Sequence, residues 1–148
     1  MIAVLQRVQN SKVVVENEIV GKIDIGLNIL LGVSAEDEKA DADFLAKKIS
    51  AFRIFSDENC NMNLSIRDVK GSALVVSQFT LCADWRKGNR PRFSNAAKPE
   101  KANELYEYFM EELEKYEISV QSGTFGAMMD VHILNDGPVT FVLNSKGK

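Results

Sequence analysis

The first third of the chain is a series of short apolar, β-branched segments, a pattern that predicts strands. The polar pair Asn17-Glu18 separates two of these segments, and asparagine readily adopts the left-handed conformation of a tight hairpin turn. Gly26 interrupts the pattern before another apolar run. We therefore expect four strands in this part of the chain, at Met1–Val8, Ser11–Glu16, Ile19–Asp24 and Leu27–Val33.

The apolar positions take on the period of a helix in two places. Within Asp37–Phe52 they recur at three- and four-residue spacing, with charged residues between them. A second apolar stripe, which ends at Tyr116, follows Pro99, and proline is favoured in the first turn of a helix. The sequence therefore predicts two helices.

The remaining apolar segments predict four more strands. Ser72–Leu81 is almost continuously apolar, as expected of a strand buried on both faces. The order of strands, helix, strand, helix, strands does not alternate as βαβ units do. We therefore expect one domain over residues 1–148, an α+β fold with a mixed or mainly antiparallel sheet. Its last three strands are predicted at Ile118–Ser122, Met129–Leu134 and Val139–Leu143.

Composition and charge narrow the class of protein. The 148 residues are 45% hydrophobic and begin with no pattern of a signal peptide, so we expect a soluble, cytoplasmic protein without a membrane segment. The net charge of −3 argues against a general DNA-coating protein. However, Arg86–Lys101 contains six basic residues and one acidic residue. This stretch is either a solvated loop or a local phosphate-contacting patch.

Several common catalytic patterns are missing. The sequence has neither a phosphate-binding Gly-rich loop nor a nucleophile elbow. Its one histidine, His132, lies in an alternating segment and is expected to face solvent. Cys60 and Cys82 fit no zinc pattern and are expected to be free thiols. We expect no metal and no cofactor.

Three polar segments are candidates for chemistry. On a strand, Gln78 and Thr80 would share one face, where they either tie down loops or line a polar pocket. Asn135-Asp136-Gly137-Pro138 has the composition of a tight turn between two strands. Gly123–Met129 places two glycines around an aromatic residue, which suggests a loop that brings backbone amides near a ligand.

Six stretches, taken together and in order, carry a resemblance to a known family. They are Met1–Val8 with Gln6-Arg7-Val8, Arg53–Asp57, Met62–Leu64, Ser77–Leu81, Gly88–Pro91 and Asn135–Thr140. Each is weak alone, but the ordered set resembles the D-aminoacyl-tRNA deacylases, the D-tyrosyl-tRNA(Tyr) deacylase family. The set spans nearly the whole chain. One departure is Arg92, where a small or acidic residue is expected.

The resemblance implies a homodimer with a compact, barrel-like sheet, two flanking helices and an active site at the subunit interface. It implies that Gly137-Pro138 forms a cis peptide that reaches into the partner's active site and screens the chirality of the aminoacyl group. Arg7 would help to hold this motif. The resemblance assigns catalytic positions to Gln78, Thr80 and Phe125, and substrate-binding positions to Ser77, Phe79, Met129, Gly137 and Pro138.

The implied substrate is the ester between a D-amino acid and the tRNA 3′ end, with glycyl-tRNA not fully excluded. Thr80 is then either a covalent nucleophile or a group that positions the ester while water or the ribose 2′-hydroxyl carries the proton. The absence of an obvious base favours positioning. Two other functions stay open: a non-catalytic tRNA- or ribosome-binding module that uses the basic stretch, and a hydrolase of free D-amino acid esters.

Overall fold

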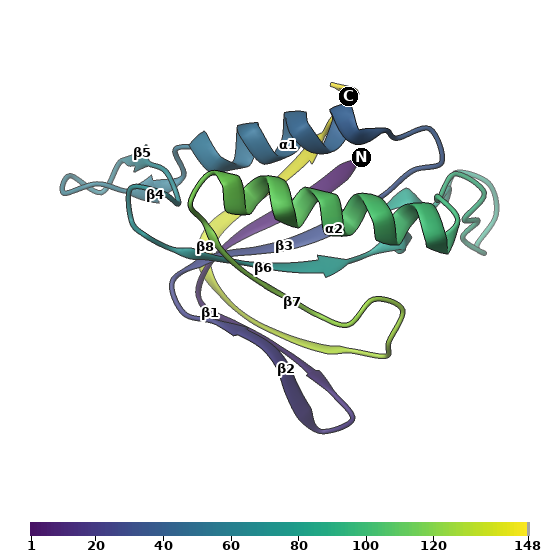
Figure 1. The fold of residues 1–148 in the computed structure, drawn as a ribbon, viewed down its shortest axis with the longest axis horizontal. Coiled ribbons are helices and arrows are strands. Elements are labelled where there is room, and N and C mark those ends of the chain that lie inside the picture. The colour runs from purple at the N-terminus through teal and green to yellow at the C-terminus, as the bar shows by residue number, and fades with distance from the viewer. Residues whose placement is uncertain (148) are drawn as a thin grey trace.

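Two helices cover one face of a strongly curved sheet in the computed structural model, which describes residues 1–147 (Figure 1). The sheet contains β1 (Ile2–Val15), β2 (Glu18–Ile23), β3 (Gly26–Gly32), β6 (Ser72–Ser77), β7 (Ser119–Ser122) and β8 (Asp130–Asn144). The helices are α1 (Lys39–Ala51) and α2 (Pro99–Lys115). A small hairpin of β4 (Phe55–Ser56) and β5 (Met62–Leu64) and a short 3₁₀ helix, η1 (Phe79–Cys82), complete the described chain.

The long strand β1 organises the sheet. One edge of β1 pairs with β3 over its first half and with β2 over its second half, while the other edge pairs with β8 along nearly its whole length. All three pairs are antiparallel, whereas β3–β6 and β6–β7 are parallel. The first two predicted strands are therefore one strand. The fold is α+β with a nearly closed, barrel-like mixed sheet, as predicted.

The turn between β1 and β2 bears out one local prediction. Asn17 has a φ of 66°, and Glu16 before it has a φ of 49°, so both residues adopt the left-handed conformation. This is the geometry of a two-residue turn whose twist matches that of a hairpin. The hairpin projects from the end of the sheet that the helices leave uncovered (Figure 1).

Two apolar clusters bury the two faces of the central strands. Ile29 of β3 and Val75 of β6 pack toward the helices, against residues such as Leu45 and Phe109. Leu74 and Val76 face the inside of the barrel, in a smaller cluster. This arrangement explains why the sequence of β6 is continuously apolar. Both helices begin and end within two residues of their predicted bounds, and Pro99 lies in the first turn of α2.

Candidate active site

The segment after β6 turns sharply instead of continuing as a strand. The backbone N–H of Gln78 donates to the carbonyl of Leu31 at 2.8 Å, and this is the last bond to β3. The chain then forms η1 and folds back over Gly32, where an added Cβ would lie 2.9 Å from Cβ of Leu81. The predicted strand Ser72–Leu81 is therefore wrong beyond Ser77, because β3 ends at Gly32 and offers no further partner.

The turn still brings Gln78 and Thr80 together. The Gln78 side-chain amide donates to the Thr80 hydroxyl, although the two residues do not share a strand face. A hydroxyl that accepts this bond keeps its own O–H available as a donor. Within residues 1–147, no carboxylate, lysine or histidine side chain is hydrogen-bonded to the Thr80 hydroxyl, whose partner is Gln78. Thr80 is exposed, Gln78 is half-buried, and both are therefore accessible to a ligand.

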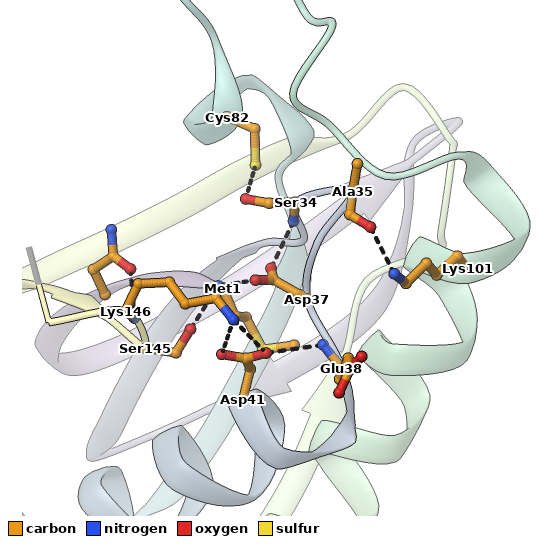
Figure 2. A network of polar contacts seen from close by, with 11 residues as sticks. Met1, Ser34, Ala35, Asp37, Glu38, Asp41, Cys82, Lys101, Ser145 and Lys146 are labelled. Atoms are coloured by element: carbon orange, nitrogen blue, oxygen red, sulfur yellow. Dashed lines mark hydrogen bonds and ion pairs between the residues drawn. The ribbon is translucent and has the colours of Figure 1, made fainter.

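A buried polar network supports η1 from behind (Figure 2). The thiol of Cys82 lies 3.6 Å from the hydroxyl of Ser34, whose backbone N–H donates to Asp37 at 2.7 Å. The other carboxylate oxygen of Asp37 accepts from the amino group of Met1 at 2.5 Å. That ion pair is almost completely buried, so it carries a strong, weakly screened attraction. The network fixes the end of η1 on the body of the protein.

The loop that carries Phe125 and Met129 is tied to β6 through one carbonyl. The oxygen of Val75 accepts from the Tyr106 hydroxyl at 2.8 Å and from the Gly123 backbone N–H at 3.3 Å. The ring of Tyr106 packs against that of Phe125, with 5.9 Å between centroids. Burial raises the pKa of Tyr106 to about 12, so the phenol remains a neutral donor at neutral pH. Sequence reasoning missed Tyr106.

The other predicted substrate-binding residues of this region flank the turn. Ser77 is the half-buried last residue of β6. Phe79 is 54% exposed, and its ring meets that of Phe93 edge to face at 5.0 Å. Met129 packs against Gly123, where an added Cβ would lie 2.7 Å from the Met129 sulfur. The region therefore combines exposed aromatic surface with the Gln78–Thr80 pair.

Residues Asn135 to Thr140, which we call the corner, form a bulge within β8. Gln6 pairs with Thr140 and Val8 pairs with Asn135, so the four residues between them on β8 lie opposite Arg7 alone. The predicted hairpin turn at this point is wrong, because both flanks of the corner pair with the same strand. The Gly137-Pro138 peptide is cis, and both residues are exposed.

Contacts from β1 hold the corner on both sides. The guanidinium of Arg7, which is 9% exposed, donates to the carbonyl of Ile54 at 2.9 Å. Its Nε lies 2.9 Å from a carboxylate oxygen of Asp136, an ion pair without hydrogen-bond alignment. The side-chain amide of Asn135 donates to the carbonyls of Arg7 and Val139, at 3.0 and 3.1 Å. The sequence indicated Arg7, whereas the anchoring by Asn135 was missed.

The corner and the Gln78–Thr80 turn lie far apart within one chain. Ser77 aligns through Leu31 with Ala3 of β1, while the corner lies opposite Arg7, four residues further along. That offset is about 13 Å along the strands, and three strand spacings across the sheet add about 14 Å. β6 also runs away from the corner as it approaches η1. The predicted site residues therefore form two groups.

Residues 1–147 contain neither a cluster of metal-ligating side chains nor a membrane-spanning helix. No group of three or more His, Cys, Asp or Glu side chains is arranged to hold a metal ion in this part of the chain. No helix of the same residues is both long and apolar enough to cross a membrane.

Comparison with known proteins gives a consistent result. A family model described as D-Tyr-tRNA(Tyr) deacylase matches residues 4–144. A protein of Bacillus cytotoxicus is 54% identical over 99% of this chain and 100% of its own length, and one of Persephonella marina is 57% identical over 99% of both. Both relatives are named D-aminoacyl-tRNA deacylase.

Solved structures agree with the fold. One called c-Myc DNA Unwinding Element Binding Protein superposes with a TM-score of 0.91 at 41% identity, over 97% of this chain and 98% of its own. Another, described as a probable eukaryotic D-amino acid tRNA deacylase, has a TM-score of 0.84 at 15% identity over 96% and 97% of the two chains, and it supports the fold alone.

Proposed function

Because this chain belongs to the D-Tyr-tRNA(Tyr) deacylase family, it is a hydrolase of the ester bond of D-aminoacyl-tRNA, and we propose that its two groups of residues divide the work. The Gln78–Thr80 turn with Phe125 handles the ester. The corner rejects L-aminoacyl groups. The observation that carries this division is the corner itself, whose Gly137 and Pro138 are exposed while Arg7 and Asn135 fix its two sides.

The chemistry needs no strong base. The aminoacyl ester is already activated, partly by the neighbouring ribose hydroxyl. A water oxygen adds to the carbonyl carbon, and the resulting oxyanion needs donors to stabilise it. The bond between that carbon and the ribose 3′-oxygen then breaks, and the oxygen leaves with a proton that the water supplied. The products are the free D-amino acid and tRNA.

Thr80 acts as a donor in this scheme and not as a nucleophile. Its hydroxyl accepts from Gln78, which leaves the O–H free to donate to a substrate. A serine- or threonine-type nucleophile needs a base within hydrogen-bond reach, and residues 1–147 place none against this oxygen. Removing one oxyanion donor typically lowers the rate about 10²–10³-fold.

The corner screens chirality by exclusion. The Gly137 and Pro138 carbonyls receive the α-ammonium group, and the space beside them admits hydrogen but not an L side chain. A D side chain points away from the protein. A clash of about 4 kcal/mol gives roughly thousandfold discrimination. Many D-amino acids, and to some extent glycine, should therefore be accepted.

Since the corner is distant from the turn of its own chain, the corner of a second copy completes each site in this proposal. β8 offers a surface for that copy, because Leu134 and Val142 on this strand are 49% and 71% exposed. Mixed dimers test the arrangement. Thr80→Ala subunits combined with Pro138→Ala subunits should regain one wild-type site per mixed dimer, with both selectivity and rate. Two separately damaged sites would instead mean that each corner serves its own subunit.

The function itself is tested with three substrates: D-tyrosyl-tRNA, L-tyrosyl-tRNA and a free D-tyrosine ester. We expect rapid ester loss from the first alone. Binding without hydrolysis would favour a tRNA- or ribosome-binding module. Equal hydrolysis of the free ester would favour a hydrolase that does not recognise RNA.

The chiral screen is tested by Gly137→Ala, whose new methyl group would lie 3.3 Å from the Asn135 side-chain oxygen. L-tyrosyl-tRNA that stays fully protected in this variant contradicts the exclusion mechanism.

A further inference from the structure

The basic segment between η1 and α2 forms a fixed projection from the body of the protein (Figure 1). The backbones of Asp84 and Arg92 exchange two hydrogen bonds, at 2.8 and 3.0 Å, and close a loop that we call the basic loop, residues 85–92. Gly88 has a φ of 71° within the loop. The returning limb is fixed by Ala97, whose N–H donates to Val33 at 2.9 Å. Backbone hydrogen bonds therefore anchor the base of the loop to the body of the protein.

The cations of the basic loop are mostly free to bind a ligand. Arg86 pairs with Asp84 at 2.9 Å. Lys87, Arg90 and Arg92 have no ion-pair partner among the residues that the structure describes, and all three are exposed. They form a local excess of positive charge on a chain whose net charge is −3. Such an excess attracts phosphate groups.

Aromatic side chains accompany these cations. Trp85 is 75% exposed and is the only tryptophan of the chain. Phe93, beside the loop, packs edge to face on Phe79 of η1, which ties the loop to the Gln78–Thr80 turn. Exposed aromatic rings among cations form the surface that binds single-stranded nucleic acid, because bases stack on the rings while the cations follow the phosphates.

Trp85 lies close enough to the turn to meet the RNA strand that carries the ester. Trp85 follows Thr80 by five residues, so their Cα atoms are at most about 18 Å apart. An aminoacyl ester held at the turn is attached to the unpaired 3′ end of a tRNA. The next nucleotides of that strand therefore begin within reach of the loop.

We propose that the basic loop binds these unpaired 3′-terminal nucleotides, with one base stacked on Trp85 and with phosphates on Lys87, Arg90 and Arg92. This inference rests on the proposed function and adds to it a surface for the RNA strand. Double-stranded RNA fits this surface less well, because its bases are stacked on one another and cannot stack on Trp85. A second copy of the loop fits less well because its charge has the same sign.

Trp85 reports on its own stacking, because no other tryptophan contributes to the fluorescence. We would titrate wild-type protein with two uncharged RNA hairpins, one with four unpaired nucleotides at its 3′ end and one with a blunt end. The overhang should quench the fluorescence saturably and the blunt end should not. With three phosphate contacts, log K should fall with log salt concentration at a slope of about −2. Equal quenching by both hairpins overturns the proposal.

A filter-binding assay, which does not depend on fluorescence, measures how single substitutions change the affinity for RNA and so identifies the binding surface. Trp85→Ala should weaken binding of the overhang hairpin about tenfold with an unchanged salt slope, and Trp85→Phe should retain most of the affinity. Arg90→Ala should make the slope less steep by about 0.7. Phe44→Ala is the matched control, since Phe44 is 50% exposed on α1 beside Lys47 and Lys48. A larger loss from Phe44→Ala than from Trp85→Ala overturns the proposal.

The test also separates this inference from the proposed function. Uncharged RNA contains no ester, so quenching measures binding regardless of hydrolysis. A wild-type protein that hydrolyses D-tyrosyl-tRNA but shows no quenching by the overhang leaves the function intact and ends the inference. Quenching without hydrolysis would contradict the proposed function and would still support the RNA-binding surface.

Discussion

The corner and the Gln78–Thr80 turn both interrupt an apolar strand with polar residues, but they are held in opposite ways. The contact within the turn is local, between residues two apart, and β3 ends beside it. The corner is held by β1, from residues about 130 positions away in the sequence. A site held by local contacts can tolerate the substitution of one residue without disturbing a distant part of the chain. A site built across the sheet depends on residues that never touch the substrate.

The largest effect is expected at the turn. If Thr80 and Gln78 act as one donor unit, Thr80→Ala should lower kcat for D-tyrosyl-tRNA about 10²-fold. The double variant with Gln78→Ala should lose little more activity than Thr80→Ala alone, because the effects of substituting two residues in contact do not add. Single-turnover kinetics of the four proteins would measure this coupling. Additive losses would mean that the two side chains act separately. Near-normal rates of Thr80→Ala would contradict the donor role of Thr80 as well as the nucleophile alternative.

Arg7→Ala should damage the corner without touching the turn. It removes a charged donor from the buried carbonyl of Ile54 and leaves Asp136 without its partner. We expect a loss of about 2 kcal/mol in the free energy of unfolding, together with increased hydrolysis of L-tyrosyl-tRNA. Urea unfolding and the ratio of L to D rates measure the two effects. Gln6→Ala, at the neighbouring exposed contact with Thr140, is the control and should retain selectivity.

A smaller effect is expected from Tyr106→Phe, which tests whether the Phe125 loop belongs to the turn. The variant loses one buried hydrogen bond, but the Val75 carbonyl still accepts from Gly123. We expect a loss of about 1 kcal/mol in stability and a reduction in kcat with little change in KM. An unchanged kcat would show that the anchoring of Phe125 is irrelevant to the reaction. Tyr106→Leu, which also removes the ring contact, should lower kcat further.

The smallest effect on activity at neutral pH is expected from a network remote from the corner. Burial alone would raise the pKa of Asp41, but bonds from the Glu38 backbone, Ser145 and Lys146 lower it to about 2. The ordinary value is 3.8, so the native state favours the charged form, and this stability is lost as pH falls from about 4 to about 2. Asp41→Asn should flatten the stability curve in that range and leave chiral selectivity at pH 7 unchanged. Acid unfolding curves that coincide would contradict this assignment.

The features that could be predicted from the sequence are those that residues close together in the chain determine. The helices follow from apolar period and from Pro99, and the turn at Asn17 follows from its tolerance of positive φ. The double burial of β6 follows from its uninterrupted apolar run.

The errors occurred where a distant partner decides the conformation. Phe79 and Leu81 look like a continuing strand, and only the end of β3 at Gly32 shows that they turn away. The composition of the corner is that of a hairpin turn, and only its pairing with β1 shows a bulge. Tyr106 is indistinguishable from a core residue until Val75 and Phe125 are seen beside it.

The bulge in β8 also limits how this protein can evolve. From the last two residues of the corner onward, Val139 is buried and Phe141 and Leu143 pack toward the core, while Thr140 and Val142 face outward. Adding or deleting one residue in the corner would shift the pairing with β1 by one position and turn these side chains to the opposite face of the sheet. Relatives can therefore vary the corner by substitution, but its length is fixed by the packing of residues that take no part in recognising the substrate.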